Sequence, residues 1–446
     1  MDRFTRKLER ARNPGNPGQW ILVLPDQLNA QLGAIARATP DETGIVVVED
    51  RHRAKFLPWH KQRLVLLWAN QRQFALELAD RGFVVDYRIV RDPLHVAVSA
   101  IAEEKGGLVL AEPAEWWVRQ AMSGAEAVDV VPHGGWLTTE SDFADACLGR
   151  KSWRMDSFYR HVRRRTGILM EDGEPVGGKF SFDVENRKPW SGEPPAPELP
   201  DFGVDEIDRE VIDLVEAEFG DNPGEIDARQ LPTTPEDAER LWLWALEQAL
   251  PLFGPFEDAM SEESRTLFHT RISSLLNLHR LMPRRILEDV LGLDIPLASK
   301  EGFVRQVLGW REFVRHVHRE TDGFRSLPDG SALDRDRGHL DSDRALPAAW
   351  WGARSGLNCL DRVVESVWEE GYSHHITRLM VLSNLATLLD VSPGQLSDWF
   401  HAAYTDAWDW VVEPNVLAMG TYATGPLMTT KPYVSGAAYI NRMSDY

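Results

Sequence analysis

The chain has 446 residues, of which 43% are hydrophobic, and a formal net charge of -20 at pH 7. This length suits two or three domains with a large buried core. The acidic charge argues against nonspecific binding of polyanions over the whole surface. No apolar run approaches the roughly 18–20 residues that a membrane span needs, and the charged N-terminus lacks a signal-type cleavage site. We therefore expect a cytoplasmic protein with no membrane partner.

The two cysteines, Cys147 and Cys359, lie far apart and form no CxxC pair. Neither a disulfide scaffold nor an autonomous four-thiolate metal site is available from them. We expect both thiols to be reduced.

The first part of the chain alternates strand and helix patterns. Residues 20–28 and 45–49 are short apolar runs typical of buried parallel strands. Residues 61–81 carry apolar side chains at helical spacing, and a strand at 83–89, a helix at 95–104 and a strand at 108–111 follow. This alternation predicts a Rossmann-like α/β domain over 1–145 with a mostly parallel sheet, whose ligands bind beyond the carboxyl ends of its strands. Because no GxGxxG loop occurs, a standard dinucleotide site is not expected there.

Residues 146–234 form a basic segment and an interdomain connector. The connector is the Pro/Gly/Glu-rich stretch 189–204, whose composition does not support a packed element. The cations of the basic segment point either to nucleic-acid contact or to a solvated helix face, with equal weight; they include Arg150, Lys151, Arg163, Arg164, Arg165, Lys179 and Arg187.

From residue 235 onward strand patterns vanish and helical periodicities succeed one another. They cover residues 238–250, 280–291, 303–319, 357–370 and 374–389, with a polar loop at 323–347. The sequence therefore predicts an all-α domain over 235–446.

A histidine pair, His374 and His375, lies inside one of these helical patterns. Adjacent helical residues point about 100° apart, so a metal ion shared by both is not expected. Each is either a core or surface histidine or a catalytic one. Arg378 follows His375 by about one turn, and Asp406 is a candidate partner for its guanidinium. Such a pair is either structural or placed to stabilise the anionic reduced form of a flavin.

Seventeen tryptophans are a high number for one chain. Most aromatic residues belong to a core, and only a flavin site would favour an electron-transfer role for some of them. The tetrad Thr270–Ser273 offers hydroxyls, backbone amides and a cation to a phosphate, although such tetrads are common.

Many ordered stretches resemble one family, the iron–sulfur bacterial cryptochromes and photolyases, which include the prokaryotic (6-4) photolyases and the deoxyribodipyrimidine photolyase-related proteins. The resemblance runs from about residue 20 to the last residue. The stretches that carry it include Met155-Asp-Ser-Phe-Tyr-Arg, Phe182-Asp-Val-Glu-Asn-Arg, Arg305-Gln-Val-Leu-Gly-Trp-Arg-Glu-Phe, His374-His-Ile-Thr-Arg-Leu-Met, Thr430-Lys-Pro-Tyr and Tyr439-Ile-Asn-Arg-Met-Ser-Asp-Tyr.

The resemblance implies the photolyase/cryptochrome fold, with FAD held in the helical domain and a 6,7-dimethyl-8-ribityllumazine antenna in the N-terminal domain. It implies a DNA photolyase, a carbon–carbon lyase that uses blue light to repair a (6-4) photoproduct, with UV-damaged DNA as partner and a monomeric state. The alternatives are a cryptochrome-like photosensor without repair activity and a truncated or decayed homologue.

The resemblance also implies roles for individual residues. His375 is the expected proton donor, with His374 beside it, and Tyr433 and Tyr439 line the lesion pocket. Trp399 and Trp351 relay electrons. The cofactor-binding residues implied are Thr270, Arg271, Ile272, Ser273, Arg311, Arg378 and Asp406.

Two departures from the family pattern accompany these matches. Asp26 and Gln27 resemble the family's antenna turn, but Val48 and Arg53 replace residues that usually help to hold the lumazine. Cys359 matches the first ligand of the family's 4Fe–4S cluster, whereas the other three ligands would follow Tyr446. Four thiolates are the rule for such a cluster, so we expect none in this chain and treat Cys359 as a vestigial ligand.

Overall fold

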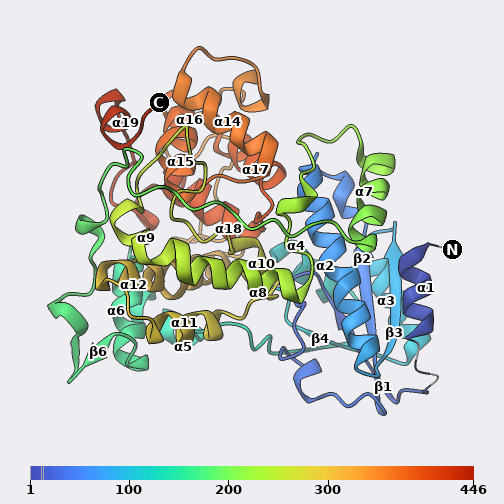
Figure 1. Ribbon diagram of the computed structural model, residues 1–446. Helices are drawn as coiled ribbons and strands as arrows, with labels where there is room; N and C mark the ends of the chain where they lie inside the picture. Colours follow the sequence, from blue (N-terminus) through green and yellow to red (C-terminus); the bar gives the residue numbers. More distant parts are fainter. Residues whose placement is uncertain (1, 12, 14) are drawn as a thin grey trace.

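The N-terminal part of the chain is built on one parallel β-sheet (Figure 1). The computed structural model describes residues 2–11, 13 and 15–446. Five strands follow the order β3-β2-β1-β4-β5, and every neighbouring pair is parallel. Their bounds are β1 Gln19–Val23, β2 Thr43–Asp50, β3 Val84–Val90, β4 Leu108–Ala111 and β5 Val128–Val131. The Rossmann-like α/β prediction is thus confirmed, and β5 is a strand that the sequence patterns did not indicate.

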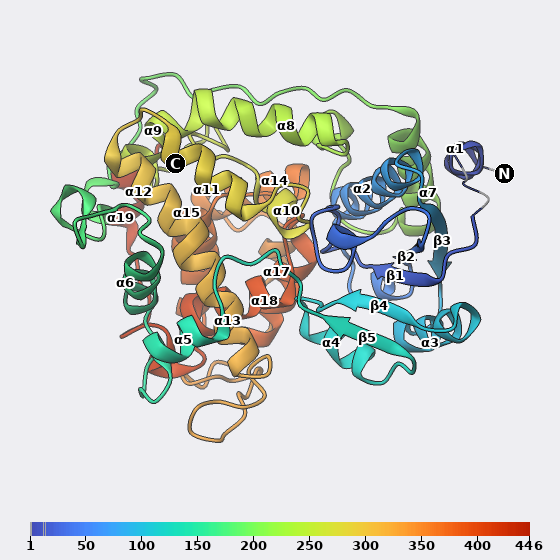
Figure 2. The same cartoon turned by 90° about the horizontal axis from the view of Figure 1, so that it is seen from below.

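Helices cover both faces of this sheet (Figures 1 and 2). Alternate residues of each central strand belong to two different apolar clusters: Ile45 and Val47 pack with α2, whereas Val46 and Val48 pack with α3 and α4. Burial on both faces explains why the strands appear as continuous apolar runs. The helices of this part are α1 Arg3–Arg10, α2 Lys61–Asp80, α3 Leu94–Lys105, α4 Trp116–Ser123 and α5 Glu140–Cys147.

The segment after α5 leaves the sheet and later returns to it. Helix α6 (Met155–Thr166) and the two-residue strands β6 (Met170–Glu171) and β7 (Glu174–Pro175) precede an extended stretch without helix or strand at 188–204. Helix α7 (Glu206–Phe219) then packs against α2. Asp205 and Asp208 form a capping box that fixes the start of α7. The segment 146–234 therefore contributes a helix, α7, to the cover of the sheet.

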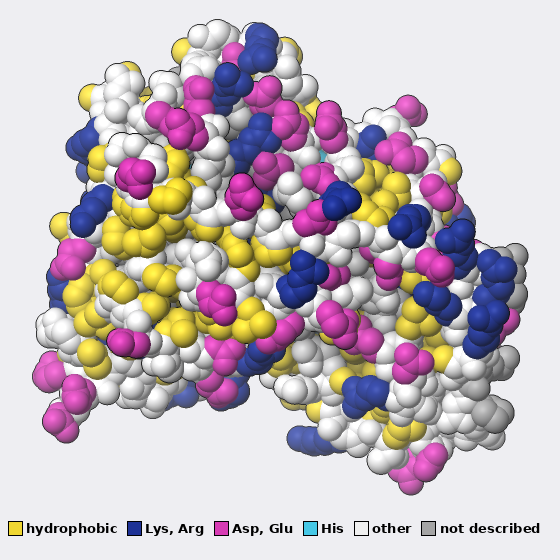
Figure 3. Space-filling model, viewed as in Figure 1, with side chains coloured by type: hydrophobic (Ala, Val, Ile, Leu, Met, Phe, Trp, Pro, Cys, Tyr) yellow, Lys and Arg dark blue, Asp and Glu magenta, His cyan; other side chains and the backbone are white. Residues whose placement is uncertain are grey.

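The rest of the chain is helical, as the periodicities predict. The helices are α8 Pro235–Trp244, α9 Leu250–Phe256, α10 Ser273–Asn277, α11 Pro283–Gly292, α12 Leu297–Val304, α13 Glu312–Glu320, α14 Asn358–Glu370, α15 His375–Thr377, α16 Asn384–Leu388, α17 Pro393–Ala403, α18 Asp409–Glu413 and α19 Ala437–Met443. Within the described residues, no helix is both long and apolar enough to cross a bilayer. Figure 3 shows acidic and basic side chains interspersed over the face that carries α7 and α14, with a band of apolar side chains beside them.

Candidate functional site: a cavity in the helical part

A cavity of about 570 Å³ lies in the helical part and gathers residues from distant parts of the chain. This volume is within the range of about 300–1,000 Å³ that small-molecule and cofactor sites occupy. Of the residues that the sequence singled out, the cavity is lined by Thr270, Arg271, Ile272, Ser273, His374, His375, Arg378, Asp406, Tyr433 and Tyr439.

An ion pair between a partly buried guanidinium and a buried carboxylate stands in the wall of this cavity. Arg378 Nη1 and Nη2 donate to the two carboxylate oxygens of Asp406, each at 3.0 Å, and Ser273 Oγ donates to Asp406 Oδ2 at 2.6 Å. Burial alone would raise the pKa of Asp406, but the charge of Arg378 and these hydrogen bonds hold it below its ordinary value. Asp406 therefore remains a carboxylate, with both oxygens satisfied.

The tetrad Thr270–Ser273 reaches the cavity just before α10. Arg271 has a φ of +59°, a left-handed conformation that is costly for a residue with a β-carbon. Its guanidinium lies 3.8 Å from the ring centroid of Tyr372 and donates to Glu370 at 2.7 Å. Arg271 thus contributes a cation that is already paired with a carboxylate.

The two adjacent histidines both line the cavity, contrary to the expectation drawn from helical geometry. His374 has φ -76° and ψ 168°, so it is extended, and α15 begins only at His375. The turn of about 100° per residue therefore does not apply between them. His374 is buried, whereas the His375 side chain is 44% exposed and its Nε2 lies 3.7 Å from Asp258 Oδ1.

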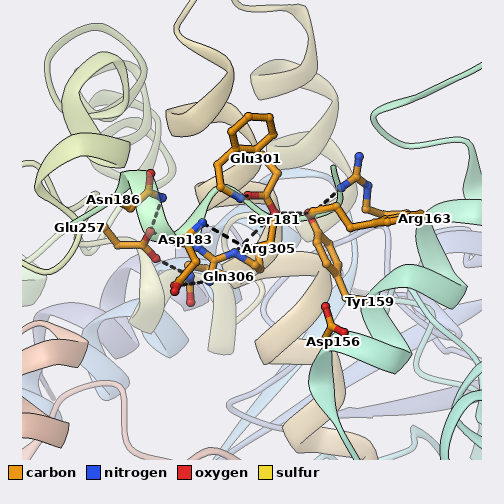
Figure 4. A network of polar contacts seen from close by, with 12 residues as sticks. Asp156, Tyr159, Arg163, Ser181, Asp183, Asn186, Glu257, Glu301, Arg305 and Gln306 are labelled. Atoms are coloured by element: carbon orange, nitrogen blue, oxygen red, sulfur yellow. Dashed lines mark hydrogen bonds and ion pairs between the residues drawn. The ribbon is translucent and has the colours of Figure 1, made fainter. Parts of the chain in front are cut away.

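A polar network fixes the segment 181–187 against the floor of the cavity (Figure 4). The buried guanidinium of Arg305 lies 3.3 Å from Glu257, 3.4 Å from Glu301 and 3.4 Å from Asp183. Glu301 also accepts hydrogen bonds from the Phe182 backbone and the Tyr159 hydroxyl; Glu257 accepts them from Asn186 and Gln306. One cation thus joins the basic segment to α9 and α12.

Three π-helical segments contribute to the cavity wall. They are Arg305–Arg311, Arg378–Ser383 and Pro414–Gly420, and each supplies lining residues. A π-helical turn re-aims the side chains that follow it and is frequent at functional sites. Asn415, which the sequence patterns did not single out, reaches the cavity from the third segment.

Aromatic rings run from the surface to the cavity. Trp351 is 46% exposed and stacks on Trp368 with ring centroids 5.6 Å apart. Trp368 meets Trp399 edge-on at 5.9 Å, and Trp399 contacts Phe400, which lines the cavity, at 5.2 Å. Sequence reasoning named Trp351 and Trp399 but missed Trp368, because nothing in its helical pattern distinguishes it from a core residue.

Arg311 does not line the cavity, although the family resemblance implied a cofactor contact. It is buried against the ring of Trp136, with 4.4 Å between the guanidinium carbon and the ring centroid, and it donates to the Leu276 carbonyl at 3.1 Å. The π-helical turn that ends at Arg311 directs Trp310, rather than Arg311, toward the cavity.

Comparisons with known proteins agree with this architecture. Residues 21–231 match the family model "Deoxyribodipyrimidine photo-lyase-related protein", and residues 303–435 match "FAD binding domain of DNA photolyase". The chain is 34% identical over 445 residues to the (6-4) photolyase of Agrobacterium fabrum, which covers 96% of this chain and 86% of that protein. The chain belongs to the DNA photolyase family.

Solved structures with low sequence identity share the photolyase fold. A class III photolyase from Agrobacterium tumefaciens matches 94% of this chain and 82% of its own with a TM-score of 0.62 at 13% identity. A cryptochrome from Synechocystis sp. PCC6803 matches 95% of this chain and 85% of its own with a TM-score of 0.59 at 14% identity. The predicted photolyase/cryptochrome fold is confirmed.

The cavity of this photolyase-family chain fits FAD, the cofactor of the matched domain. Its volume suits a ligand of this size, and its wall offers the Thr270 hydroxyl and the Arg378–Asp406 pair, which Ser273 supports by donating to Asp406. Hydroxyls and guanidinium groups are the donors that phosphate and flavin ring oxygens require.

The antenna region of this photolyase-family chain does not fit a lumazine. A space of about 40 Å³ lies beyond the carboxyl ends of β1 and β2, lined by Asp26, Arg53, Trp59 and Glu115. It is far below the roughly 300 Å³ at which ligand pockets begin. Arg53 pairs with Glu115 and covers Trp59. Asp26 accepts a hydrogen bond from the Ala114 backbone, and Gln27, which does not line the space, donates to the Ala111 carbonyl. This turn ties β1 to β4.

The basic segment supplies fewer free cations than its sequence suggests. Arg163 is fully buried and donates to the carbonyls of Ile168, Leu169 and Phe180, so it does not reach DNA as the prediction proposed. Arg165 pairs with Asp142, Lys179 with Glu185, and Arg187 with Asp183. An open groove remains along α6, with Arg150, Arg160 and Arg164 among its lining residues.

The two thiols lie in separate clusters. Cys147 is buried in α5 with the large N-terminal core, and burial raises its pKa to about 11. Cys359, at the start of α14, packs beside Tyr446 against the second core cluster. Within the described part of the chain, Cys359 therefore has no second thiolate with which to share a cluster.

We predict that Arg305→Met destabilises the protein by about 3 kcal/mol or more, because it leaves Glu257 and Glu301 as buried carboxylates without a cation. Urea denaturation followed by circular dichroism measures the change. The control is Arg229→Met, which breaks an exposed pair with Asp201 and should cost less than about 1 kcal/mol. Equal losses in both variants would contradict the assigned role of Arg305.

We predict that Asp26 makes stability fall as pH rises from about 4 toward 7. Burial raises its pKa from 3.8 to about 7, so the folded protein holds this proton more tightly than the unfolded chain does. The loss across this window is of order a few kcal/mol. Asp26→Asn keeps an acceptor for Ala114 and should flatten the slope relative to the wild type in denaturation series at several pH values. If the free energies of unfolding of Asp26→Asn and the wild type differ by the same amount at every pH, the prediction is contradicted.

Proposed function

We propose that this protein repairs (6-4) photoproducts in DNA, using blue light, as the name of its Agrobacterium fabrum relative indicates. The observation that carries the proposal is the convergence of His375, Tyr433 and Tyr439 at one cavity that also contains the Arg378–Asp406 pair. Reductive cleavage of such a lesion needs an electron and a proton at the same place, and this cavity offers a site for each.

FAD, when bound in this cavity, supplies the light-absorbing one-electron donor. Asp406 and Arg378 would hold it, and their pair keeps a guanidinium fixed in the cavity wall. Tyr404 lies under the Arg378 guanidinium, 4.0 Å from it, and its hydroxyl shares a hydrogen bond with Ser373 at 2.8 Å. These contacts hold the guanidinium in one orientation before any ligand binds.

His375 is the proposed proton donor to the lesion. Its side chain is half exposed, so its ring faces the open side of the cavity, and Asp258 lies close enough to orient it. Histidine suits this role because its ordinary pKa lies near neutral pH. Burial raises the pKa of Tyr439 to about 12, with Asp258 adding to the effect, so this hydroxyl remains a neutral hydrogen-bond donor to the extruded bases.

Trp351, Trp368 and Trp399 form the proposed electron relay. Successive ring centroids are 5.6 and 5.9 Å apart. The Trp350 carbonyl accepts hydrogen bonds from the indoles of both Trp368 and Trp399, each at 2.9 Å. One backbone oxygen therefore fixes the mutual orientation of the two inner rings. Trp351 is the surface end of the relay, where a reductant in solution can reach it.

UV-damaged DNA is the proposed partner, bound through the cavity mouth and the groove along α6. Arg150, Arg160 and Arg164 there would contact phosphates and position the duplex without reading its sequence. Enzymes that act on bases inside a duplex extrude them into a pocket, and the aromatic lining of the cavity suits such bases. We further propose that the protein acts as a monomer in the cytoplasm, where its two thiols remain reduced.

We predict that His375→Ala lowers light-dependent repair by about 100-fold or more while flavin content stays unchanged, because only proton donation is lost. The assay follows restoration of an oligonucleotide that carries one (6-4) lesion. His95→Ala, an exposed residue of α3, serves as the control. Unchanged repair in His375→Ala would reject the proton-donor role, and flavin photoreduction without repair in the wild type would identify a photosensor instead.

We predict that Trp368→Phe slows flavin photoreduction several-fold while repair by chemically pre-reduced protein is retained. The phenyl ring keeps the stack but is harder to oxidise than indole. The rate is measured by following the loss of flavin absorbance in the blue during illumination. Trp117→Phe, at an exposed position of α4, is the matched control. A rate equal to that of the control would exclude Trp368 from the relay.

A further inference from the structure

A third histidine joins the histidine pair inside the cavity. His269 lies in the loop before α10 and stacks on His374, with ring centroids 4.5 Å apart and planes 9° from parallel. It meets His375 edge-on at 5.5 Å. One ring nitrogen from each of the three histidines lies within 4.8 Å of the other two. No sequence pattern indicated this cluster, because 105 and 106 residues separate His269 from its partners.

Two of these histidines have ring nitrogens without a partner. His269 is 6% exposed and His374 is 4% exposed, and among the described residues neither His269 Nε2 nor His374 Nδ1 has a hydrogen-bond partner. Buried polar atoms without partners are uncommon and costly. Burial holds the pKa of both residues well below its ordinary value, so both rings are neutral and have a free lone pair. Neutral imidazole is the form that binds metal ions.

A carboxylate lies beside this set but outside it. Asp258 Oδ1 lies 3.7 Å from His375 Nε2, and Asp258 lines the same cavity. The three imidazole nitrogens form a donor set for Zn²⁺ and for its first-row neighbours, with one coordination position left open. Mg²⁺ and Ca²⁺ prefer oxygen ligands alone and do not match it.

We propose that His269, His374 and His375 form a binding site for a transition-metal ion of the Zn²⁺ type, with Asp258 orienting the ring of His375. Tetrahedral coordination at Zn–N distances of about 2.0–2.1 Å places ligand nitrogens about 3.3 Å apart. The rings therefore rotate slightly inward on binding. His375 has the greatest freedom for this movement, because 44% of its side chain is exposed, and the cavity gives the ion a path from solvent.

Occupation of the site has a consequence that rests on the proposed function. The ring of His375 cannot donate a proton to a lesion while the metal holds its nitrogen, and the ion stands where extruded bases would enter. Zn²⁺ therefore inhibits repair reversibly, and a chelator restores it. The site acts as a metal-dependent brake on the enzyme rather than as part of its reaction.

The decisive experiment measures Zn²⁺ binding in the dark, without DNA, on full-length protein that carries no polyhistidine tag. Isothermal titration, checked by competition with a chromophoric chelator, should show one ion per chain. X-ray absorption at the zinc edge should show imidazole ligands. These readouts do not depend on repair, so a failed repair assay leaves them intact, whereas absent binding overturns the metal site and leaves the proposed function untouched.

Variants assign the ligands. His269→Gln and His375→Gln should each weaken Zn²⁺ binding by at least about tenfold, and Asp258→Asn should weaken it less. His375 is half exposed, so its variant keeps the test valid even if His269→Gln fails to fold. His95→Gln is the matched control for an exposed surface histidine and should bind as the wild type does. Equal affinity in His375→Gln and the wild type would overturn the proposal.

Discussion

The ion pair between partly buried Arg378 and buried Asp406 is the interaction on which the cavity depends. Two charges withdrawn from water cost several kcal/mol each unless geometry and hydrogen bonding offset the loss. Here both oxygens of Asp406 accept from Arg378, Ser273 adds a donor, and Arg378 Nε donates to the Ser373 carbonyl at 2.7 Å. The pair joins the start of α10, the histidine segment and the loop before α18. Any shift of these three elements would leave a charge unpaired, so they hold one arrangement.

The same segment explains how two adjacent histidines serve one cavity. Arg378 anchors the first turn after α15, and the chain enters that turn in an extended conformation at His374. An extended residue followed by a helix start places both rings on one side, where a continuous helix would separate them. The stack of His269 on His374 then supports the buried ring, which leaves His375 as the ring that faces solvent. The division into a buried and an exposed histidine thus follows from where the helix begins.

The sequence predicts the elements better than it predicts which side chains meet. Apolar runs and helical periodicities located four of the five strands of the sheet, whereas β5 was missed because its edge position leaves it partly exposed. Arg163 was misread as a surface cation, although it follows buried Tyr159 by four residues and so falls on the apolar stripe of α6. His269, Trp368 and Asn415 were missed because their roles arise from tertiary contacts. The failed contact of Arg311 has a local cause, since a π-helical turn shifts side-chain directions that an α-helical pattern assumes.

The overall acidity of the chain is compatible with a DNA partner because some cations of the basic segment have no carboxylate partner. Arg160, Arg165, Lys179 and Arg187 each have a carboxylate within ion-pair distance. Among the residues that the structure describes, Arg150, Lys151 and Arg164 form no ion pair and are exposed. Repulsion from the distant acidic surface is screened over about 8 Å at physiological ionic strength. In the proposed DNA complex, local attraction at the groove along α6 would decide where a phosphate backbone settles. With few unpaired cations, the chain would favour a damaged site, where extruded bases add contacts in the cavity, over intact duplex.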